Sequence, residues 1–399
     1  MQTVAAYEST MAPFDPVYQT EIIRNNRELQ VEAPILALLL AQGRTLRVGN
    51  ETFNWNSADL PTRTTTISNG GAAYDAATTS LVVTSGAVFR IGDLVLCEAT
   101  REMILVTAIS TNTLTVVRGI GNANGGVAAS AGSVANTVIL RRVGPAMGEA
   151  SGVPADADFG STTHTQNIQT FKTAVSVSGR AAVLDPQVES PLAFNRAQAH
   201  EVFLRDIEHA ILWGGRQGSG VTNAGGKKVT TMHGLYNAVT SNVFSVGGTM
   251  TRTYLEATVC AQVFAKGSSV KTLVAGTILL QTVADLYRSS GWRPEEVEVA
   301  GIRLTRIRNM HGELLLVPSR ALSGAFAGDG LILDMDPEFR LRFTEGELNG
   351  KPRSGLPNLM EVTQTSGTDA QTEQWFAELG LQWGSQSKHA RISGVTGAA

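Results

Sequence analysis

The spacing of apolar side chains predicts one long helix in the middle of the chain. Ser190 is a residue type favoured at a helix N-cap, Pro191 suits the first helical position, and Gly214 with Gly215 suits the end of a helix. We therefore predict a helix over residues 191–213. Between these signals, apolar residues recur at intervals that place them on one helical face: Ala199, Phe203, Ile207, Ala210 and Ile211.

After this helix the pattern changes from helical to alternating spacing. Two shorter apolar stripes predict helices over residues 254–265 and 277–289. From there apolar and polar side chains alternate, as they do in half-buried strands. The order of strands, helices and then strands predicts an α+β chain. The alternation predicts a hairpin that turns at residues 309–312, and further strands within 330–336, 338–345, 374–383 and 388–395.

The first half of the chain is predicted to hold a separate β-rich module. Phe53 and Trp55 alternate with polar residues, which is typical of a half-exposed strand, and residues 168–184 form another β-type run. Between them, residues 65–144 contain several short apolar runs rich in Val and Thr. We predict that this segment is a small β-sandwich or barrel, inserted between two strands that pair with each other. Residues 1–48 show few regular signals, and we expect an extended arm there.

Charge and composition narrow the class of protein. Charged residues make up 17% of the chain, below the roughly 25% of ordinary soluble proteins, which leaves neutral surface for other chains to cover. The formal net charge is −3, and no basic stripe of the kind that coats phosphates is visible. The longest apolar run, residues 33–41, is shorter than the roughly 20 residues that cross a bilayer. We expect neither a membrane protein nor a protein that neutralises DNA directly.

The sequence lacks a convincing catalytic, cofactor or metal site. Residues 220–227, GVTNAGGK, come close to a phosphate-binding loop, but neither Ser nor Thr follows Lys227 and no strand leads into it. Asp334 and Asp336 are close enough to share a metal, yet acids at a strand end are more often part of a turn. Cys97 and Cys260 form no metal or redox motif. We expect no enzyme activity, no cofactor and no metal.

Charges of both signs are interleaved over residues 293–353. A solvated face is the default interpretation of such a pattern. The alternative is salt bridging between subunits, where opposed charges fix the register of the contact. Together with aromatic and basic residues near the β-rich module, these give our candidate contacts between subunits: Phe53, Trp55, Phe171, Lys172, Arg303, Arg306, Arg308, Arg340, Arg342, Glu345 and Glu347.

Several stretches resemble the major capsid proteins of tailed bacteriophages, which have the Hong Kong 97 fold. FKTAVSVSGRAA followed by FLRDIEHAILWGG is similar to the strand that leads into the spine helix of that family. FAKGSSVKTLVAGTILLQTVADLY is similar to the helices of its axial domain. GELLLVPSR, GDGLILDMD, ELGLQW and HARISG are similar to its later strands. The resemblance covers most of the chain and is weakest over residues 1–48 and 65–144.

The resemblance implies a subunit that forms the hexamers and pentamers of an icosahedral shell around double-stranded DNA. Implied partners are other copies of the chain, a scaffold, a portal and a decoration protein, without sequence-specific DNA binding. The implied location is the virion capsid, with assembly in the host cytoplasm. The implied domains are an arm (1–48), an extended loop (49–64 with 145–186), the inserted module (65–144), a peripheral domain (187–234), an axial domain with returning peripheral strands (235–380) and a C-terminal strand and tail (381–399).

Some members of that family link a lysine on the extended loop to an asparagine of a neighbour. Lys172 is the lysine in the corresponding region here, and Asn349 or Asn358 would be the acceptor. No activating acid is evident beside them, so an ordinary charge near an interface is the preferred interpretation of Lys172.

Two other functions remain open at this point. One is a β-rich virion tail protein that binds or hydrolyses carbohydrate through residues 65–144. That function predicts exposed aromatic side chains, whereas the segment contains Tyr74 and Phe89 but no Trp. The other is a cytoplasmic enzyme, and the lack of site chemistry argues against it.

Overall fold

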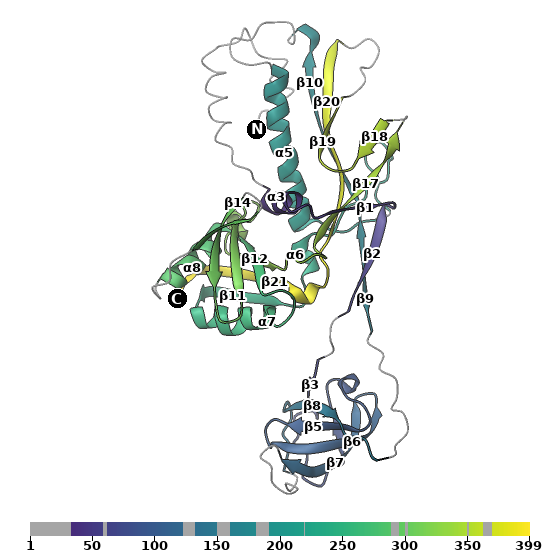
Figure 1. The fold of residues 1–399 in the computed structure, drawn as a ribbon, viewed down its shortest axis with the longest axis vertical. Helices are drawn as coiled ribbons and strands as arrows, with labels where there is room; N and C mark the ends of the chain where they lie inside the picture. The colour runs from purple at the N-terminus through teal and green to yellow at the C-terminus, as the bar shows by residue number, and fades with distance from the viewer. Residues whose placement is uncertain are drawn as a thin grey trace. The chain divides into compact units, whose positions relative to one another are not determined.

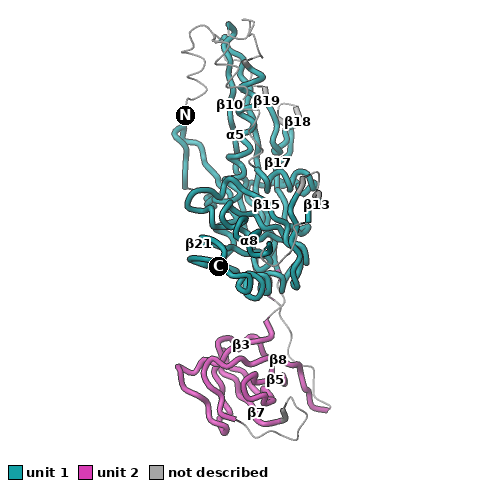
Figure 2. The backbone as a smooth tube through the Cα atoms, turned by 90° about the vertical axis from the view of Figure 1, so that its left-hand side faces the viewer, with its two compact units in different colours: residues 1–57, 162–399 teal, residues 58–161 magenta. Residues whose placement is uncertain are grey.

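The computed structural model of the chain divides into two compact units (Figure 2). Unit 1 combines residues 1–57 with 162–399, and unit 2 comprises residues 58–161. No helix within the described residues is long and apolar enough to cross a bilayer. The structure describes residues 33–58, 62–122, 132–149, 160–180, 191–218, 220–288, 295–299, 302–348, 351–361 and 369–399.

The first sheet of unit 1 has six strands in the order β1, β17, β20, β10, with β18 beside β17 and β19 beside β20. β1 lies parallel to β17, and the other pairs are antiparallel. These strands come from both ends of the chain, so the first sheet closes only when distant segments meet. Their bounds are β1 (Thr45–Val48), β10 (Gln169–Ser178), β17 (Arg340–Leu348), β18 (Lys351–Ser354), β19 (Asn358–Glu361) and β20 (Ala370–Gln382).

A long helix, α5 (Pro191–Trp213), runs along β10 and β20 (Figure 1). The predicted helix over residues 191–213 is therefore confirmed. Its stripe is buried, because the side chains of Phe203, Ile207 and Ile211 are exposed by 1% or less. The same core takes in four apolar side chains of α3 (Pro34–Ala41): Ile35, Leu36, Leu38 and Leu39.

The second sheet of unit 1 has seven strands in the order β11, β21, β16, β12, β15, β14, β13. α8 (Thr277–Arg288) packs on it and buries Leu279, Val283 and Leu286. β14 and β15 form the hairpin that the alternating pattern predicted. The strands are β11 (Val243–Met250), β12 (Val270–Ala275), β13 (Glu295–Val299), β14 (Ile302–Arg308), β15 (Glu313–Pro318), β16 (Gly330–Leu333) and β21 (Ala390–Ala398).

Two short strands of unit 1 form a ribbon of their own. β2 (Thr52–Ser57) pairs antiparallel with β9 (Thr162–Asn167). The chain of unit 2 runs between these two strands. We predicted that residues 51–57 pair with the strand within 168–184, and this is wrong, because β10 pairs with β20 instead.

Unit 2 is a six-stranded antiparallel sheet in the order β3, β8, β5, β6, β7, β4, wrapped around its own apolar core. The predicted insert, residues 65–144, lies within it. The β-rich character predicted for this segment is confirmed. The strands are β3 (Thr64–Thr66), β4 (Ser80–Val82), β5 (Asp93–Cys97), β6 (Glu102–Ser110), β7 (Thr113–Asn122) and β8 (Ile139–Pro145).

Two further predictions differ from the structure. Residues 33–48 are not an extended arm, because α3 is helical and β1 is paired with β17, while residues 1–32 lie outside the described part of the chain. The helix predicted at 254–265 is present, but its first part, Tyr254–Cys260, is π-helical and continues into α7 (Ala261–Val263). The described residues also contain short helical turns: α6 (Leu235–Ala238), Gly86–Val88, Gly324–Phe326 and Gln386–Lys388.

Truncation of the buried stripe tests the role of α5 as the centre of unit 1. Phe203→Ala removes a ring that is 1% exposed, and we expect the free energy of unfolding to fall by about 3–5 kcal/mol. Val202→Ala is the matched control, because its side chain is 41% exposed and its loss should cost less than about 0.5 kcal/mol. Denaturant unfolding of unassembled subunits measures both. Equal losses from the two variants would contradict the assignment.

Candidate functional site

The near-miss motifs of the sequence have structural explanations. Among the described residues, no group of His, Cys, Asp and Glu is arranged to hold a metal ion. In the loop that resembles a phosphate-binding motif, the Asn223 Oδ1 accepts hydrogen bonds from the backbone N–H groups of Gly225 (3.0 Å) and Lys227 (2.9 Å). These amides are occupied by the chain itself, so the loop offers no ready phosphate cradle.

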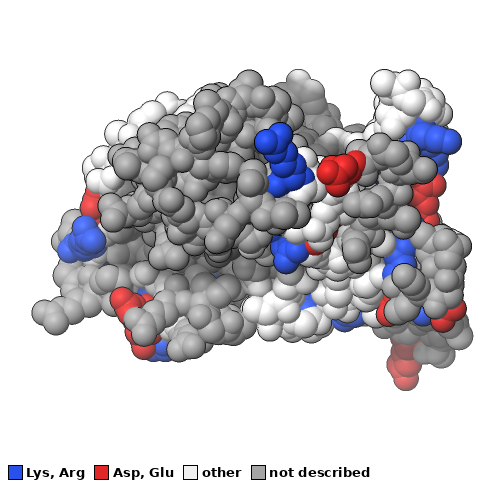
Figure 3. Space-filling model, turned by 90° about the horizontal axis from the view of Figure 1, so that it is seen from above, with Lys and Arg blue, Asp and Glu red and all other residues white. Residues whose placement is uncertain are grey.

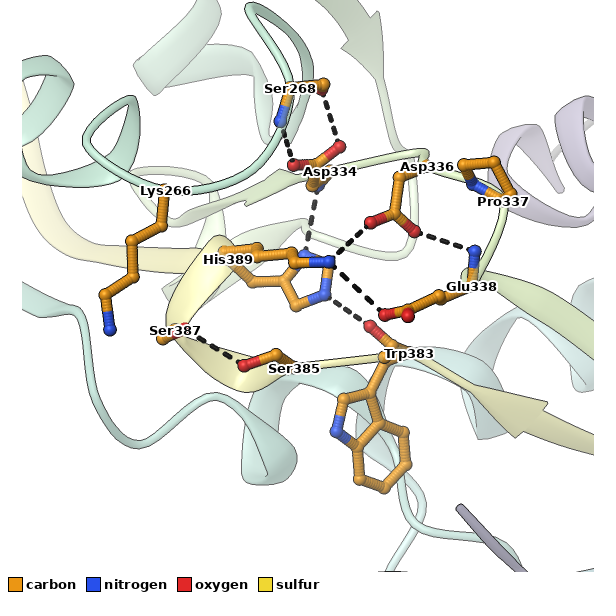
Figure 4. Close-up of polar contacts among 12 residues, drawn as sticks. Lys266, Ser268, Asp334, Asp336, Pro337, Glu338, Trp383, Ser385, Ser387 and His389 are labelled. Carbon is orange, nitrogen blue, oxygen red and sulfur yellow. Dashed lines mark hydrogen bonds and ion pairs between the residues drawn. The ribbon is translucent and has the colours of Figure 1, made fainter. Parts of the chain in front are cut away.

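Asp334 belongs to a buried charge cluster instead of a metal site (Figure 4). Its carboxylate accepts hydrogen bonds from Lys271 Nζ at 2.8 Å and from the backbone N and the Oγ of Ser268 at 2.8 and 2.6 Å. Lys271 Nζ also donates to the carbonyl oxygens of Lys266 and Lys388, each at 3.0 Å. The three protons of the ammonium group therefore all have acceptors, which is the condition under which a fully buried charge is tolerated.

Burial alone would raise the pKa of Asp334, but the hydrogen bonds from Lys271 and Ser268 outweigh it and hold the pKa below its usual value. Burial also lowers the pKa of Lys271, although the contact with Asp334 acts in the opposite direction.

His389 joins the cluster from a second segment. Its Nδ1 accepts from the backbone N–H of Asp334 at 3.0 Å, and its Nε2 donates to the carbonyl oxygen of Trp383 at 2.6 Å. Burial lowers the pKa of His389 to about 4. The imidazole is thus neutral at pH 7, and its two partners fix the proton on Nε2.

The cluster lies where the chain passes between the two sheets of unit 1. Residues 334–339 lead from β16 to β17, residues 383–389 lead from β20 to β21, and residues 239–242 lead from α6 to β11. Lys388 Nζ ion-pairs with Asp336 (2.8 Å) and Glu338 (3.3 Å), which ties the first two segments together. Asn242 Nδ2 donates to the carbonyl oxygens of Ser387 and His389, each at 2.9 Å, which adds the third. The cluster therefore joins the three segments through which the chain passes between the two sheets.

A second buried charge joins α5 to α3. The carboxylate of Glu208, a fully buried residue of α5, accepts hydrogen bonds from the backbone N–H groups of Ile35 (3.1 Å) and Leu36 (3.0 Å). These amides lie in the first turn of α3 and have no partner within that helix. Burial raises the pKa of Glu208 to about 7, although both hydrogen bonds act in the opposite direction.

Three aromatic candidate contacts lie inside their own chain. Phe53 and Phe171 are 9% and 8% exposed, and Phe171 belongs to the core of the first sheet. Trp55 packs against that core, and its Nε1 donates to the carbonyl oxygen of Gly384 at 3.0 Å. Phe53 and Phe171 thus present little free surface in the single chain, Trp55 is partly exposed, and the alternation predicted for a half-exposed strand is present on β2. Their role as contacts between subunits stays a prediction. Lys172 is exposed, and its Nζ lies 5.8 Å from the centroid of the Phe376 ring.

Two of the charged candidates are ion-paired within the chain. Arg306 and Arg308 both form ion pairs with Glu295 and Glu313 on neighbouring strands. These pairs across β13, β14 and β15 are those of a solvated, internally matched sheet face. The described surface in Figure 3 likewise shows positive and negative side chains close to one another.

Four further charged candidates lie on one strand of the first sheet, β17. Arg342 Nε donates to Gln382 Oε1 at 2.7 Å, and Arg340 Nε donates to the carbonyl oxygen of Pro337. Glu345 and Glu347 are exposed on β17 and line a groove of about 610 Å³ together with Arg47 and Arg353. The side chain of Arg303 and the whole of Asn349 lie outside the described residues. Asn358 is described, and its amide donates to the carbonyl oxygen of Ser354 at 2.8 Å.

Removal of the ammonium group of Lys271 tests how much the buried charge cluster stabilises unit 1. Lys271→Met leaves the carboxylate of Asp334 buried without its counter-charge, and we expect a loss of about 3–5 kcal/mol in the free energy of unfolding. Lys227→Met, at an exposed lysine, should change it by less than about 0.5 kcal/mol. Both are measured by denaturant unfolding at pH 7. If Lys271→Met had the same free energy of unfolding as the wild type, the pair of Lys271 and Asp334 would not stabilise unit 1.

The raised pKa of Glu208 predicts a pH dependence with a defined sign. The folded chain takes up this proton as pH falls through about 7, whereas the ordinary value for an unfolded glutamate is 4.5. Lowering the pH from 7.5 to 5.5 should therefore stabilise the folded chain through this group by roughly 2 kcal/mol. Glu208→Gln should lack this increment. Unfolding curves of both proteins at the two pH values measure it, and identical pH slopes would contradict the role of Glu208.

Comparison with known proteins gives remote structural similarities and one family match. The encapsulin of the holo-SrpI complex from Synechococcus elongatus PCC 7942 is 15% identical, with 60% of this chain and 78% of that chain covered and a TM-score of 0.43. The capsid of a native GTA particle is 11% identical over 93% of this chain and 92% of that chain, with a TM-score of 0.43. A structure from Mycobacterium phage Cain is 10% identical, with 96% of this chain and 92% of that chain covered and a TM-score of 0.44.

No curated protein sequence matches the chain. The family assignment rests on sequence, because the family model described as SU10 major capsid protein matches residues 18–396. This match confirms the resemblance to phage major capsid proteins that the strand and helix segments of the sequence indicated. It also excludes the tail-protein alternative, in agreement with unit 2, where Phe89 is 3% exposed and Tyr74 is partly buried against the core. The chain belongs to the SU10 major capsid protein family.

Proposed function

We propose that this phage major capsid protein assembles into hexamers and pentamers, which close an icosahedral shell around double-stranded DNA. The observation that carries the proposal is the family match over residues 18–396, which leaves few residues outside the capsid protein family. The role is structural, without catalysis. Assembly takes place in the host cytoplasm with a scaffold and a portal, and a decoration protein joins the finished shell.

The ribbon of β2 and β9 supports contacts between copies. A two-stranded ribbon by itself is marginally stable in water. On β2, Thr52, Asn54 and Asn56 are exposed, while Phe53 is buried beside Trp55, which packs against the chain's own core. In the proposed shell, a neighbouring copy covers the polar face of this ribbon, which then acts as the extended loop. Many such head-to-tail contacts close rings when the rotation between copies allows it.

The parts of the chain take corresponding roles in the proposal. The first sheet with α5 is the peripheral domain, and the second sheet with α8 is the axial domain near the symmetry axes. Residues 1–32 are the arm that reaches a neighbour, and unit 2 is the outward-facing insert. Glu345, Glu347 and Lys172 are exposed charges available for contacts between copies.

The charge of the chain suits a container that does not neutralise its contents. The net charge is −3, and a protein that neutralises phosphates needs a basic surface. Some of the described basic side chains are instead paired with acids on neighbouring strands, as in the Arg306 and Arg308 pairs with Glu295. We propose that the charge of the packaged DNA is balanced by cations in solution.

Negative-stain electron microscopy of the purified chain, before and after slow concentration, is the direct test. Shells, tubes, or rings of six and five subunits are the expected result. A compact trimer that binds glycans would overturn the proposal. If the chain alone stays monomeric, it is co-expressed with the phage scaffold and examined again. Failure to form any shell together with the scaffold would also overturn the proposal.

Deletion of residues 1–30 tests the role of the arm. The deletion leaves α3 and its hydrogen bonds to Glu208 in place, so unit 1 should fold and stay soluble. Assembly should be lost, because an extended segment gains order only on its partner and contributes to the contact there. Circular dichroism checks folding, and microscopy checks assembly beside the full chain. Normal shells from the deleted protein would contradict the prediction.

A further inference from the structure

A groove of about 640 Å³ opens in unit 1 beside the ribbon of β2 and β9. Its walls come from β9, from the segment after α5, and from Trp383 and Gln386 at the passage between the sheets. The groove uses no residue of unit 2, and none of the candidate contacts named from the sequence lines it.

The lining of this groove is cationic and aromatic. Arg216 is exposed, and its Nη1 donates to the carbonyl oxygen of Thr165 at 3.0 Å, which holds the guanidinium beside β9. His233 and His164 lie next to Trp383, with ring centroids 5.6 and 6.3 Å from it. No described residue that lines the groove is acidic. The charge of Arg216 is therefore unopposed within the groove.

Trp383 contributes an aromatic wall to the groove and is 4% exposed. Its Nε1 is inaccessible, so the polar contact that the groove offers to an occupant is the guanidinium of Arg216. An occupant that carries carboxylates would supply the counter-charge that Arg216 lacks within the groove.

Residues 1–23 have the matching composition. They contain Glu8, Asp15 and Glu21 and no Lys or Arg, so all of their charged side chains are acidic. They also contain Tyr7, Phe14 and Tyr18, whose rings suit contact with the histidines and Trp383. The described chain begins at Ala33. With residues 1–23 in the groove, the nine residues 24–32 span at most roughly 30 Å, so the groove that they reach lies within that distance of Ala33 in the proposed shell.

We propose that the groove formed by Arg216, His233, His164 and Trp383 docks residues 1–23 of a neighbouring copy. The inference rests on the proposed shell and names the surface on which its arm ends. An acidic, aromatic segment replaces water over the rings and places carboxylates beside Arg216. Because the groove touches the passage between the two sheets, docking there connects the arm of one copy to the centre of unit 1 of the next.

A binding experiment tests the groove without requiring shells. A fluorescent peptide of residues 1–23 is titrated with full-length, unassembled subunits, and anisotropy gives the Kd. Arg216→Glu should weaken binding at least about tenfold, because a favourable charge contact becomes a repulsive one. Lys227→Glu is the matched control, since it makes the same charge change on an exposed loop that does not line the groove, and it should alter the Kd less than about twofold.

A peptide with Glu8→Gln, Asp15→Asn and Glu21→Gln should bind the wild-type protein as weakly as the original peptide binds Arg216→Glu. The thermal unfolding of Arg216→Glu is compared with wild type to show that the fold is intact, and Arg216→Gln serves in its place if it is not. Equal binding by wild type, Arg216→Glu and Lys227→Glu would overturn the proposal, as would the absence of any peptide binding.

A cross-linking experiment tests docking between copies. Subunits with Phe14→Cys are assembled with differently tagged subunits that carry Thr240→Cys, an exposed position in the groove. The native Cys97 and Cys260 are buried. A disulfide between the two tags is expected, and Thr222→Cys, exposed outside the groove, should give none. Shells that form without the Thr240 cross-link would overturn the docking site alone, whereas failure of wild-type subunits to form shells would count against the proposed function.

Discussion

The buried pair of Lys271 and Asp334 is the constraint on which the arrangement of unit 1 depends. The chain passes between the two sheets three times, and the described hydrogen bonds bring all three passages to this place. A charge with 0% exposure is costly unless every proton and lone pair is matched. Lys271 lies on β12, and Asp334 follows directly after the neighbouring strand β16, so the pair fixes the end of the second sheet at which the three passages meet.

The sequence predicted the elements whose apolar spacing is regular. The stripe of α5 and the alternation of β14 and β15 report directly which face is buried, and both elements appear where expected. α3 was missed because PILALLLA has no polar face to give a period, since it is buried on nearly all sides. The partner of β10 was missed because alternation identifies a strand but carries no information about which strand lies beside it.

For the candidate site too, local sequence patterns predicted some features and missed those that depend on distant parts of the chain. Phe53 and Phe171 were expected at a surface, because a residue's alternation with polar neighbours does not tell a face covered by its own chain from one left free. Asp334 drew attention as an acid beside Asp336, but its partner is 63 residues away. One signal for that partner was present, namely a lone lysine within the apolar strand VKTLVA. A charge at such a position requires a buried counter-charge. Glu208, in the middle of an amphipathic helix, gives no such signal.

The two units are joined in a way that makes one of them an exchangeable cassette. In unit 1, Ser57 and Thr162 are paired across the ribbon, so the chain leaves and returns at neighbouring points. In unit 2, the first strand and the last strand are paired with each other, with Thr64 opposite Arg141. A hairpin turn of a few residues could bridge the first gap without moving any strand of the host. Residues 58–161 can thus be gained, lost or replaced in evolution as one block, and capsid lineages can vary this module while the sheets that carry it stay unchanged.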